Sequence, residues 1–302
     1  MTGISSTTGK SHSEVISRMA PAKINLCLEI IGKREDSYHD IRSVMQTVDL
    51  HDILTFAPAE GGALTLECDD PALEADVEGN LVLKAARLLR SAAGLEGKVG
   101  AHITLRKRIP LSAGLGGGSS DAAATLLGLR DLWRIKPGTV DLLDLAEQLG
   151  SDVPFFLEGK TALVEGRGEI VTRIPSPPPG WVVLVCPRYD LADKTKKLYS
   201  SLTSMDMSEG IVTHRLIAAL VAGHFPDSSL LYNAFERVAY EVFEGLERVR
   251  QKVTHAAQRD VHLSGSGPTL YVLYPGSQER SASRLYDALV LEGMRVYLAG
   301  LS

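Results

Sequence analysis

Residues 110–121 read Pro-Leu-Ser-Ala-Gly-Leu-Gly-Gly-Gly-Ser-Ser-Asp, and this glycine-rich stretch decides the fold. An alternating run at 101–109 predicts a strand before it, and an Ala/Leu-rich run from about 119 to 133 predicts a helix after it. Glycine has no Cβ atom and permits positive φ, so the backbone N–H groups of such a segment can converge on an anion. The first N–H groups of the helix are also free for phosphate oxygens. The stretch therefore predicts a phosphate site.

Two details of this stretch refine the prediction. Glycines 114, 116, 117 and 118 supply the permissive backbone, and Ser119, Ser120 and Asp121 are expected to supply N-cap chemistry for the helix. The helix dipole adds about 0.3–1 kcal/mol toward a negative ligand. A Walker A loop requires Gly-Lys-Ser/Thr, whereas this chain has Gly-Ser-Ser. A dinucleotide fingerprint GxGxxG that starts at Gly114 ends on Ser119, so both of these commoner nucleotide loops are excluded.

Composition limits the class of protein. The chain has 302 residues, a net charge of −5 and 44% hydrophobic residues, and this length predicts two compact domains. No apolar stretch reaches the roughly 18 residues of a membrane span. The negative charge does not favour a nucleic-acid partner. The basic triplet at 106–108 is interpreted as a solvated strand edge.

The cysteines and the N-terminal residues predict the cellular compartment of the protein. Cys27, Cys68 and Cys186 lie far apart without a CxxC pair, which favours buried thiols in a reducing cytosol over disulfides or a zinc site. Residues 1–17 are rich in Ser and Thr and have no apolar core, so they are predicted to be a flexible extension and not a secretory signal. The expected location is cytoplasmic.

Elements of both types alternate along the chain and predict an α+β class. Residues 175–180 hold four prolines, which predicts a stiff linker between an N-terminal domain at 18–175 and a C-terminal domain at 181–302. Asn80 is a suitable N-cap for the run that follows it. The predicted strands are 22–31, 41–57, 63–68, 101–109, 181–186 and 293–299; helices are predicted after Asn80 and at 119–133, 139–149, 211–222, 233–256 and 278–292; 160–174 is predicted as a hairpin and 261–274 as strand–turn–strand.

Further motifs connect the glycine stretch to a family. The stretch resembles the ATP loop of the GHMP kinases, and Pro21-Ala-Lys-Ile-Asn-Leu26 and Leu263-Ser-Gly-Ser-Gly-Pro-Thr269 resemble that family's other two motifs in the same order. The resemblance implies a two-domain GHMP kinase fold, with a ribosomal-S5-like N-terminal domain and a ferredoxin-like C-terminal domain. It implies ATP and Mg²⁺ as cofactors. The ATP-binding residues that it implies are Pro110, Leu111, Ser112, Ala113, Gly114, Leu115, Gly116, Gly117, Gly118, Ser119 and Ser120.

Within the family, residues 21–44 and 149–156 are most similar to the branch that phosphorylates cytidyl-methylerythritol in the non-mevalonate isoprenoid pathway. This implies transfer of a phosphoryl group to the 2-hydroxyl of that small-molecule substrate. Other readings remain open: another GHMP kinase acting on mevalonate or homoserine, or a non-catalytic ligand sensor on the same fold. The sequence leaves the oligomeric state and the magnesium ligands open.

Two residues are the catalytic candidates. Asp152 follows a helix-terminating Gly150 and precedes Val153-Pro154, which indicates a constrained turn, although a simple N-cap role is also possible. Lys23 lies early in an apolar strand, where an ammonium group needs a ligand, water or a counter-charge. The resemblance implies that Asp152 is the base and that Lys23 pairs with it. Asn25 is two residues further along, hence on the same strand face, and is a candidate substrate contact.

The remaining candidates are residues for binding the cytosine base of the substrate and residues of the third motif. Tyr38 and His39 distinguish the cytidyl branch, since an aromatic ring can stack on cytosine and an imidazole can bond its polar edge. Tyr199 is a candidate for the opposite side of the base. The branch normally has Gly before this Tyr-His pair, where this chain has Ser37, so the base pocket can differ in shape. Gly265, Ser266 and Gly267 are expected beside the site as a tight turn.

Overall fold

The computed structural model describes residues 15–36, 38–74, 77–189, 191 and 193–302. The predicted extension at 1–17 therefore lies mostly outside the described residues, as does Ser37. Ile16 and Ser17 belong to the first strand, so regular structure starts two residues earlier than the expected boundary at Arg18.

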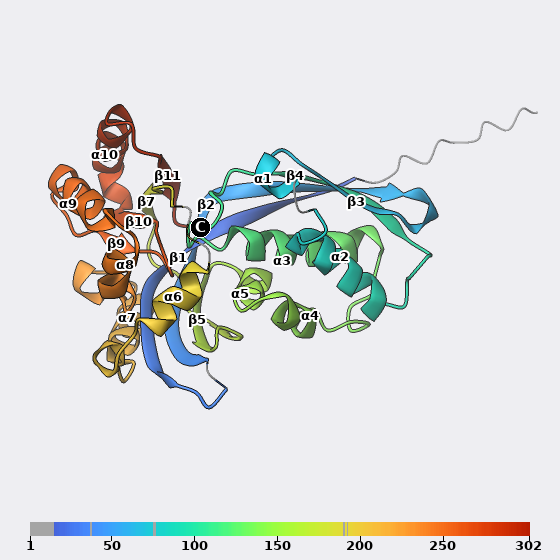
Figure 1. Ribbon diagram of the computed structural model, residues 1–302, viewed down its shortest axis with the longest axis horizontal. Helices are drawn as coiled ribbons and strands as arrows, with labels where there is room; N and C mark the ends of the chain where they lie inside the picture. The colour runs from blue at the N-terminus through green and yellow to red at the C-terminus, as the bar shows by residue number, and fades with distance from the viewer. Residues whose placement is uncertain (1–14, 37, 75–76, 190, 192) are drawn as a thin grey trace, which may run out of the picture.

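The first sheet is organised around two long antiparallel strands, β1 (Ile16–Lys33) and β2 (His39–Ala59), which run through much of the molecule in Figure 1. Its strand order is β3-β4-β2-β1-β8, and the hairpin of β5 and β6 attaches to β2. β-Bulges interrupt the β1–β2 register between Pro21 and Ala22 and between Asn25 and Cys27. Bulges redirect side chains, and these two flank Lys23 and Asn25. The other strands of this sheet are β3 (Leu64–Cys68), β4 (Gly100–Arg106), β5 (Thr161–Gly166), β6 (Ile170–Arg173) and β8 (Tyr232–Asn233).

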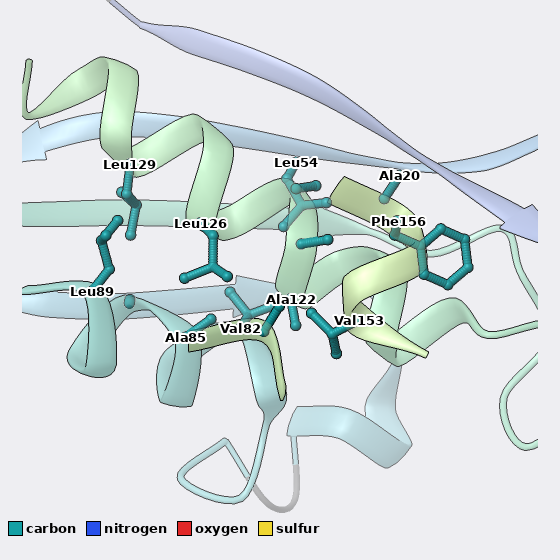
Figure 2. Packing of buried hydrophobic residues seen from close by; sticks show 14 of the residues in the cluster. Ala20, Leu54, Val82, Ala85, Leu89, Ala122, Leu126, Leu129, Val153 and Phe156 are labelled. Carbon is teal, nitrogen blue, oxygen red and sulfur yellow. The ribbon is translucent and has the colours of Figure 1, made fainter. Parts of the chain in front are cut away.

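Helices cover one face of this sheet in Figure 1. Side chains alternate between the two faces of β2 and β4. Leu54, Phe56 and Ile103 therefore point into the core, where they pack against the helices. Figure 2 shows Leu126 and Leu129 of α3 beside Leu89 of α2. The helices here are α1 (Pro71–Glu74), α2 (Leu81–Ala92), α3 (Gly117–Leu132), α4 (Leu142–Leu149) and α5 (Val153–Glu158).

The second sheet has the order β11-β7-β10-β9 and is antiparallel throughout. The single helix predicted over 233–256 is wrong: the chain forms α8 (Glu236–Val242) and α9 (Leu246–Ala257), because Gly245 takes a φ of +84° between them. The remaining elements are β7 (Gly180–Val185), β9 (His262–Leu263), β10 (Leu270–Pro275), β11 (Val296–Gly300), α6 (Lys194–Ser200), α7 (Ile211–Val221), α10 (Glu279–Leu291) and 3₁₀ turns at Glu60–Gly62, Ser204–Asp206, Ser228–Leu230 and Gly276–Gln278.

The two sheets share a common core along β1. Ile24 and Leu26 of β1 pack in one cluster with Val182 and Leu184 of β7. The hydroxyl of Tyr271 on β10 donates to the backbone oxygen of Asn25, 2.9 Å away. The predicted α+β class is confirmed, and strand β1 is the structural link between its two halves.

Candidate active site

A cavity of about 590 Å³ lies at the junction of the two halves. Its lining comes from segments far apart in the chain: β1, the glycine-rich stretch, the α4–α5 turn, α6 and the β9–β10 turn. The lining residues that sequence analysis had also selected are Lys23, Asn25, Tyr38, His39, Gly114, Gly116, Asp152, Tyr199, Gly265 and Ser266. The structure thus gathers all three motifs around one cavity.

The glycine-rich stretch forms a tight loop that leads into α3. Gly114 and Gly116 have φ values of +81° and +72°. A Cβ atom on Gly114 would lie 2.5 Å from the backbone oxygen of Ser264, and one on Gly116 would lie 2.8 Å from the ring of Phe156. Glycine is therefore required at both positions by conformation and by space.

The predicted helix start was wrong by two residues. Gly116 occupies the N-cap position in left-handed conformation, and α3 begins at Gly117. Gly117 is therefore helical, and Ser119 and Ser120 lie in the first turn and do not cap it. The reason is conformational: the positive φ of Gly116 turns the chain into the helix before the serines are reached. The first free N–H groups of α3 consequently belong to the glycines.

The loop is held against the other two motifs by hydrogen bonds. The N–H of Lys23 donates to the oxygen of Leu115 over 2.9 Å. From the third motif, the Ser264 hydroxyl donates to the oxygen of Gly114, and the N–H of Thr269 donates to the oxygen of Ala113. These bonds fix the loop on both sides. Gly265 and Ser266, expected beside the site, line the cavity itself.

Lys23 and Asp152 meet at the cavity. The Nζ of Lys23 lies 3.5 Å from Oδ2 of Asp152 and donates to Oδ1 of Asn25 over 2.7 Å. The amide of Asn25 in turn donates to the Ser43 hydroxyl, which donates to the oxygen of Cys27. Lys23 is 5% exposed and Asp152 30% exposed, so the ammonium is buried while the carboxylate faces the cavity. Ser43, on β2, was missed because its only sequence signal is its position in an alternating strand.

Asp152 sits at the N-terminus of α5, which raises the alternative that it merely caps that helix. Its side chain makes no capping hydrogen bond within the described part of the chain. The carboxylate is instead directed to Lys23. The geometry therefore favours the cavity role over the capping role.

The opposite end of the cavity is aromatic. The rings of His39 and Tyr199 stack, with centroids 4.9 Å apart and planes at 24°. Tyr199 also meets Phe235 edge-on at 4.9 Å. Tyr38 is 55% exposed, and the guanidinium carbon of Arg167 lies 5.1 Å from its ring centre. The three aromatic candidates thus line the same cavity. Tyr199, which was expected on the opposite side of the base, packs directly on His39.

Protonation at this end follows from burial. Desolvation lowers the pKa of His39, and the charge of Lys33 lowers it further, so the imidazole is neutral near pH 7. Burial raises the pKa of Tyr199 to about 12, with the charge of Asp152 acting in the same direction. The Tyr199 hydroxyl is therefore available as a donor.

Two cations of the lining were not selected from the sequence. Arg167 projects from the β5–β6 hairpin, and Lys196 belongs to α6. The hairpin turn at 165–168 was predicted, but its place beside Tyr38 depends on the pairing of β5 with β2. Sequence spacing carried no signal for either contact.

A second cluster lies under the loop and corrects the interpretation of 106–108 as a solvated edge for Lys107 alone, since Arg106 and Arg108 are exposed as expected. Lys107 has a side chain only 5% exposed, and its Nζ binds the carboxylates of Asp52 and Asp121. Asp52 also accepts the N–H groups of Arg108 and Ile109. Burial raises the pKa of Asp121 to about 7; Lys107 opposes this shift and Asp52 adds to it. The strand ends at Arg106, and the next residue, Lys107, directs its ammonium to these buried carboxylates.

Comparisons with known proteins agree with this geometry. Residues 80–160 match the family described as GHMP kinases N terminal domain. A solved structure of 4-(cytidine 5'-diphospho)-2C-methyl-D-erythritol kinase superposes with a TM-score of 0.79 at 35% identity, over 95% of this chain and 99% of the other. Homoserine kinase from Cytophaga hutchinsonii shares the fold, with a TM-score of 0.70 at 17% identity over 98% and 97% of the two chains. Fold and site together define a two-domain GHMP kinase, an ATP-dependent small-molecule phosphotransferase.

Curated relatives narrow the assignment. A 4-diphosphocytidyl-2-C-methyl-D-erythritol kinase of Dehalococcoides mccartyi is 39% identical over 285 residues, which is 94% of this chain and 97% of the relative. The enzyme of the same name from Pelotomaculum thermopropionicum is 40% identical over 86% of this chain and 89% of its own. The chain belongs to the 4-diphosphocytidyl-2-C-methyl-D-erythritol kinase family.

Proposed function

We propose that this enzyme transfers the γ-phosphoryl group of ATP to the 2-hydroxyl of 4-(cytidine 5'-diphospho)-2-C-methyl-D-erythritol, a step in the non-mevalonate isoprenoid pathway. The observation that carries the proposal is the Lys23–Asp152 pair beside the glycine loop, in a cavity whose other end is aromatic. The names of the relatives supply the substrate. The cavity offers a place for a phosphate chain at one end and for a flat base at the other.

Asp152 is the proposed general base. Phosphoryl transfer requires mainly positioning and charge stabilisation from the protein. The substrate hydroxyl gives its proton to Asp152, its oxygen forms the new bond to the γ-phosphorus, and the bond to the leaving ADP breaks. The partial exposure of Asp152 toward the cavity supports access of a hydroxyl to it.

Lys23 is the proposed electrostatic partner. Its ammonium lies 3.5 Å from the Asp152 carboxylate and faces the same space as the loop glycines, where a transferred phosphoryl group carries negative charge. Asn25 fixes the direction of the ammonium, and Ser43 in turn holds the Asn25 amide. The ground-state network is thus already arranged for the transfer.

The backbone of residues 110–120 is the proposed ATP site, with the start of α3 directed at phosphate. Magnesium is proposed as the ion that accompanies ATP at this site. No cluster of three or more His, Cys, Asp or Glu side chains suited to a metal occurs in the described ranges. The residues present fit such an ion: the buried Ser120 hydroxyl has no hydrogen-bond partner among the described residues, and hydroxyl oxygens suit Mg²⁺. Bound there, the ion would neutralise phosphate charge.

Cytosine is proposed to bind at the aromatic end. Tyr38, His39 and Tyr199 offer ring faces for stacking, and the neutral imidazole and the Tyr199 hydroxyl can bond the polar edge of the base. Tyr38 is the more exposed of these rings, which leaves a face open to a ligand.

A cytoplasmic location is proposed as well. Cys27, Cys68 and Cys186 are buried free thiols in the structure, which fits a reducing compartment. No helix among the described residues has the length and apolar character required to cross a bilayer.

A phosphorylation assay tests the substrate. Purified enzyme receives ATP, Mg²⁺ and either the cytidyl-methylerythritol substrate, mevalonate or homoserine. We expect phosphorylation of the cytidyl compound. Phosphorylation of mevalonate or homoserine alone would overturn the substrate and leave the fold intact.

A further inference from the structure

Lys194, the first residue of α6, bridges two of the motifs from outside the cavity. Its Nζ donates to the backbone oxygen of Ser112 over 2.7 Å and to the backbone oxygen of Gly267. Ser112 belongs to the glycine-rich loop, and Gly267 belongs to the turn of the third motif. The neighbouring Thr195 hydroxyl lies 3.2 Å from that of Ser266. One end of α6 therefore joins the two loops that meet at the phosphate site.

Among the residues that the structure describes, Lys194 has no acidic partner. No carboxylate lies within ion-pair distance of it among the described residues. Neither segment that it bonds, 110–118 or 263–269, contains a titratable side chain. Carbonyl dipoles alone compensate a partly buried ammonium incompletely. The junction therefore favours an additional anion.

The surroundings of Lys194 make this imbalance larger. Burial and the positive charge of Lys23, on β1, together lower the pKa of Lys194 to about 8. Asp152 is already paired with Lys23. Lys196 on the same helix adds positive charge, and Asp193 is exposed at the helix start. Burial raises the pKa of the Tyr189 phenol, so this group stays neutral.

We propose that Lys194 is a positioning residue for the nucleotide: its ammonium holds the loop and the third-motif turn together, and the phosphate chain of ATP supplies the anion that it lacks. This proposal rests on the proposed kinase function. It makes α6 part of the nucleotide site, although the helix lies about 80 residues beyond the loop in sequence. A protonated lysine binds phosphate more strongly than a neutral one, so affinity should fall as pH rises above the pKa.

Calorimetric titration with ADP and Mg²⁺ between pH 7 and 9.5 tests the proposal. For the unmodified enzyme we expect a Kd that is steady up to about pH 8 and then increases. Lys194→Met should weaken ADP binding at pH 7 by about tenfold or more and remove the component of the pH dependence that begins near pH 8. Lys194→Arg keeps its charge throughout this range, so it should bind ADP well at pH 7 and lack that component too.

Two comparisons separate this effect from others. Lys197→Met removes the same charge from an exposed position of α6 and should leave the Kd unchanged. Lys194→Arg changes only position 194, so any pH dependence of the Kd that persists in this variant arises elsewhere in the protein. A Kd of Lys194→Met within twofold of the unmodified enzyme at pH 7, or an unaltered pH profile in Lys194→Arg, would overturn the proposal. Absence of ADP binding by the unmodified enzyme would instead overturn the kinase function on which it rests.

Discussion

Lys23 and Lys107 lie on either side of the glycine loop and are equally buried, yet their surroundings differ. A Cβ atom on Gly116 would lie 3.1 Å from Cγ of Lys23, and one on Gly117 would lie 3.4 Å from Nζ of Lys107. Both side chains are 5% exposed. Lys107 is bound by the carboxylates of Asp52 and Asp121, which are themselves buried. Lys23 has a longer contact, 3.5 Å, with a carboxylate that faces the cavity.

We interpret the difference as separating a structural lysine, Lys107, from the lysine proposed to act in catalysis, Lys23. Lys107 binds both carboxylates away from the cavity, and the raised pKa of Asp121 shows that a single ammonium only partly compensates two buried acids. At Lys23, the ammonium and Asp152 both retain capacity for a ligand, and Asn25 fixes the geometry. Burial of a lysine thus says little about its role until its partners are known.

Replacing Lys23 by Met should have the largest effect on activity. Loss of the ammonium removes charge stabilisation at the transferred phosphoryl group, and we expect kcat to fall at least ~100-fold. Steady-state kinetics with ATP and the cytidyl substrate provide the measurement. Lys84→Met on the exposed face of α2 is the matched control. An unchanged kcat in Lys23→Met would contradict the proposed catalytic role that distinguishes Lys23 from Lys107.

Replacing Lys107 by Met should act on stability. The substitution leaves the buried carboxylates of Asp52 and Asp121 without a counter-charge, so the free energy of unfolding should fall by about 3–5 kcal/mol. Denaturant unfolding measures this change. Adding Asp121→Asn to the variant should recover part of the loss, because one buried charge is then removed. A loss below about 1 kcal/mol would show that the cluster is not structural.

Replacing Tyr199 by Ala tests the aromatic end. Stacking of a base on an aromatic side chain contributes about 1–3 kcal/mol, so KM for the cytidyl substrate should rise about tenfold with KM for ATP unchanged. Tyr199→Phe retains the ring and should show a smaller effect. Equal increases in KM for the cytidyl substrate and for ATP would show that Tyr199 does not act by binding the base.

The smallest expected effect is the pH dependence of stability at Asp121. Burial raises its pKa to about 7 in the folded protein, well above the usual range of an aspartate. The folded state therefore holds a proton that the unfolded chain releases, and this group's contribution to stability is lost as pH rises toward 7. Relative to the unmodified enzyme, Asp121→Asn should gain about 2 °C or more in unfolding midpoint between pH 5 and pH 7.5. A difference that does not vary with pH would contradict the raised pKa.

Local signals in the sequence accounted for much of the fold and for one end of the site. Asn80 was predicted to cap a helix, and its side chain accepts the N–H of Val82. The loop could be recognised in the sequence because backbone with positive φ favours glycine, and several glycines cluster there. Lys107 was misread because its partner Asp52 lies 55 residues away, and charge spacing along the chain does not reveal such a pair. Arg167 reaches the cavity because β5 pairs with β2, and the sequence does not reveal this pairing either.

Asp152 was selected through a motif, yet its pairing with Lys23 depends on how α5 packs beside β1. The stretch at 233–256 shows the converse failure: its helical periodicity was read correctly, but the break at Gly245 was overlooked. A glycine within an apolar periodic run can be tolerated or can end a helix, and packing decides which.

The most direct test measures kcat and the unfolding midpoint of Asp152→Asn and Asp121→Asn side by side. Both variants replace a carboxylate next to a buried lysine by an amide of the same shape. The account predicts that Asp152→Asn lowers kcat by about 10²–10⁴-fold with little change in the midpoint, while Asp121→Asn keeps kcat within a few-fold. A near-normal kcat in Asp152→Asn would contradict the assignment of Asp152 as the base in phosphoryl transfer.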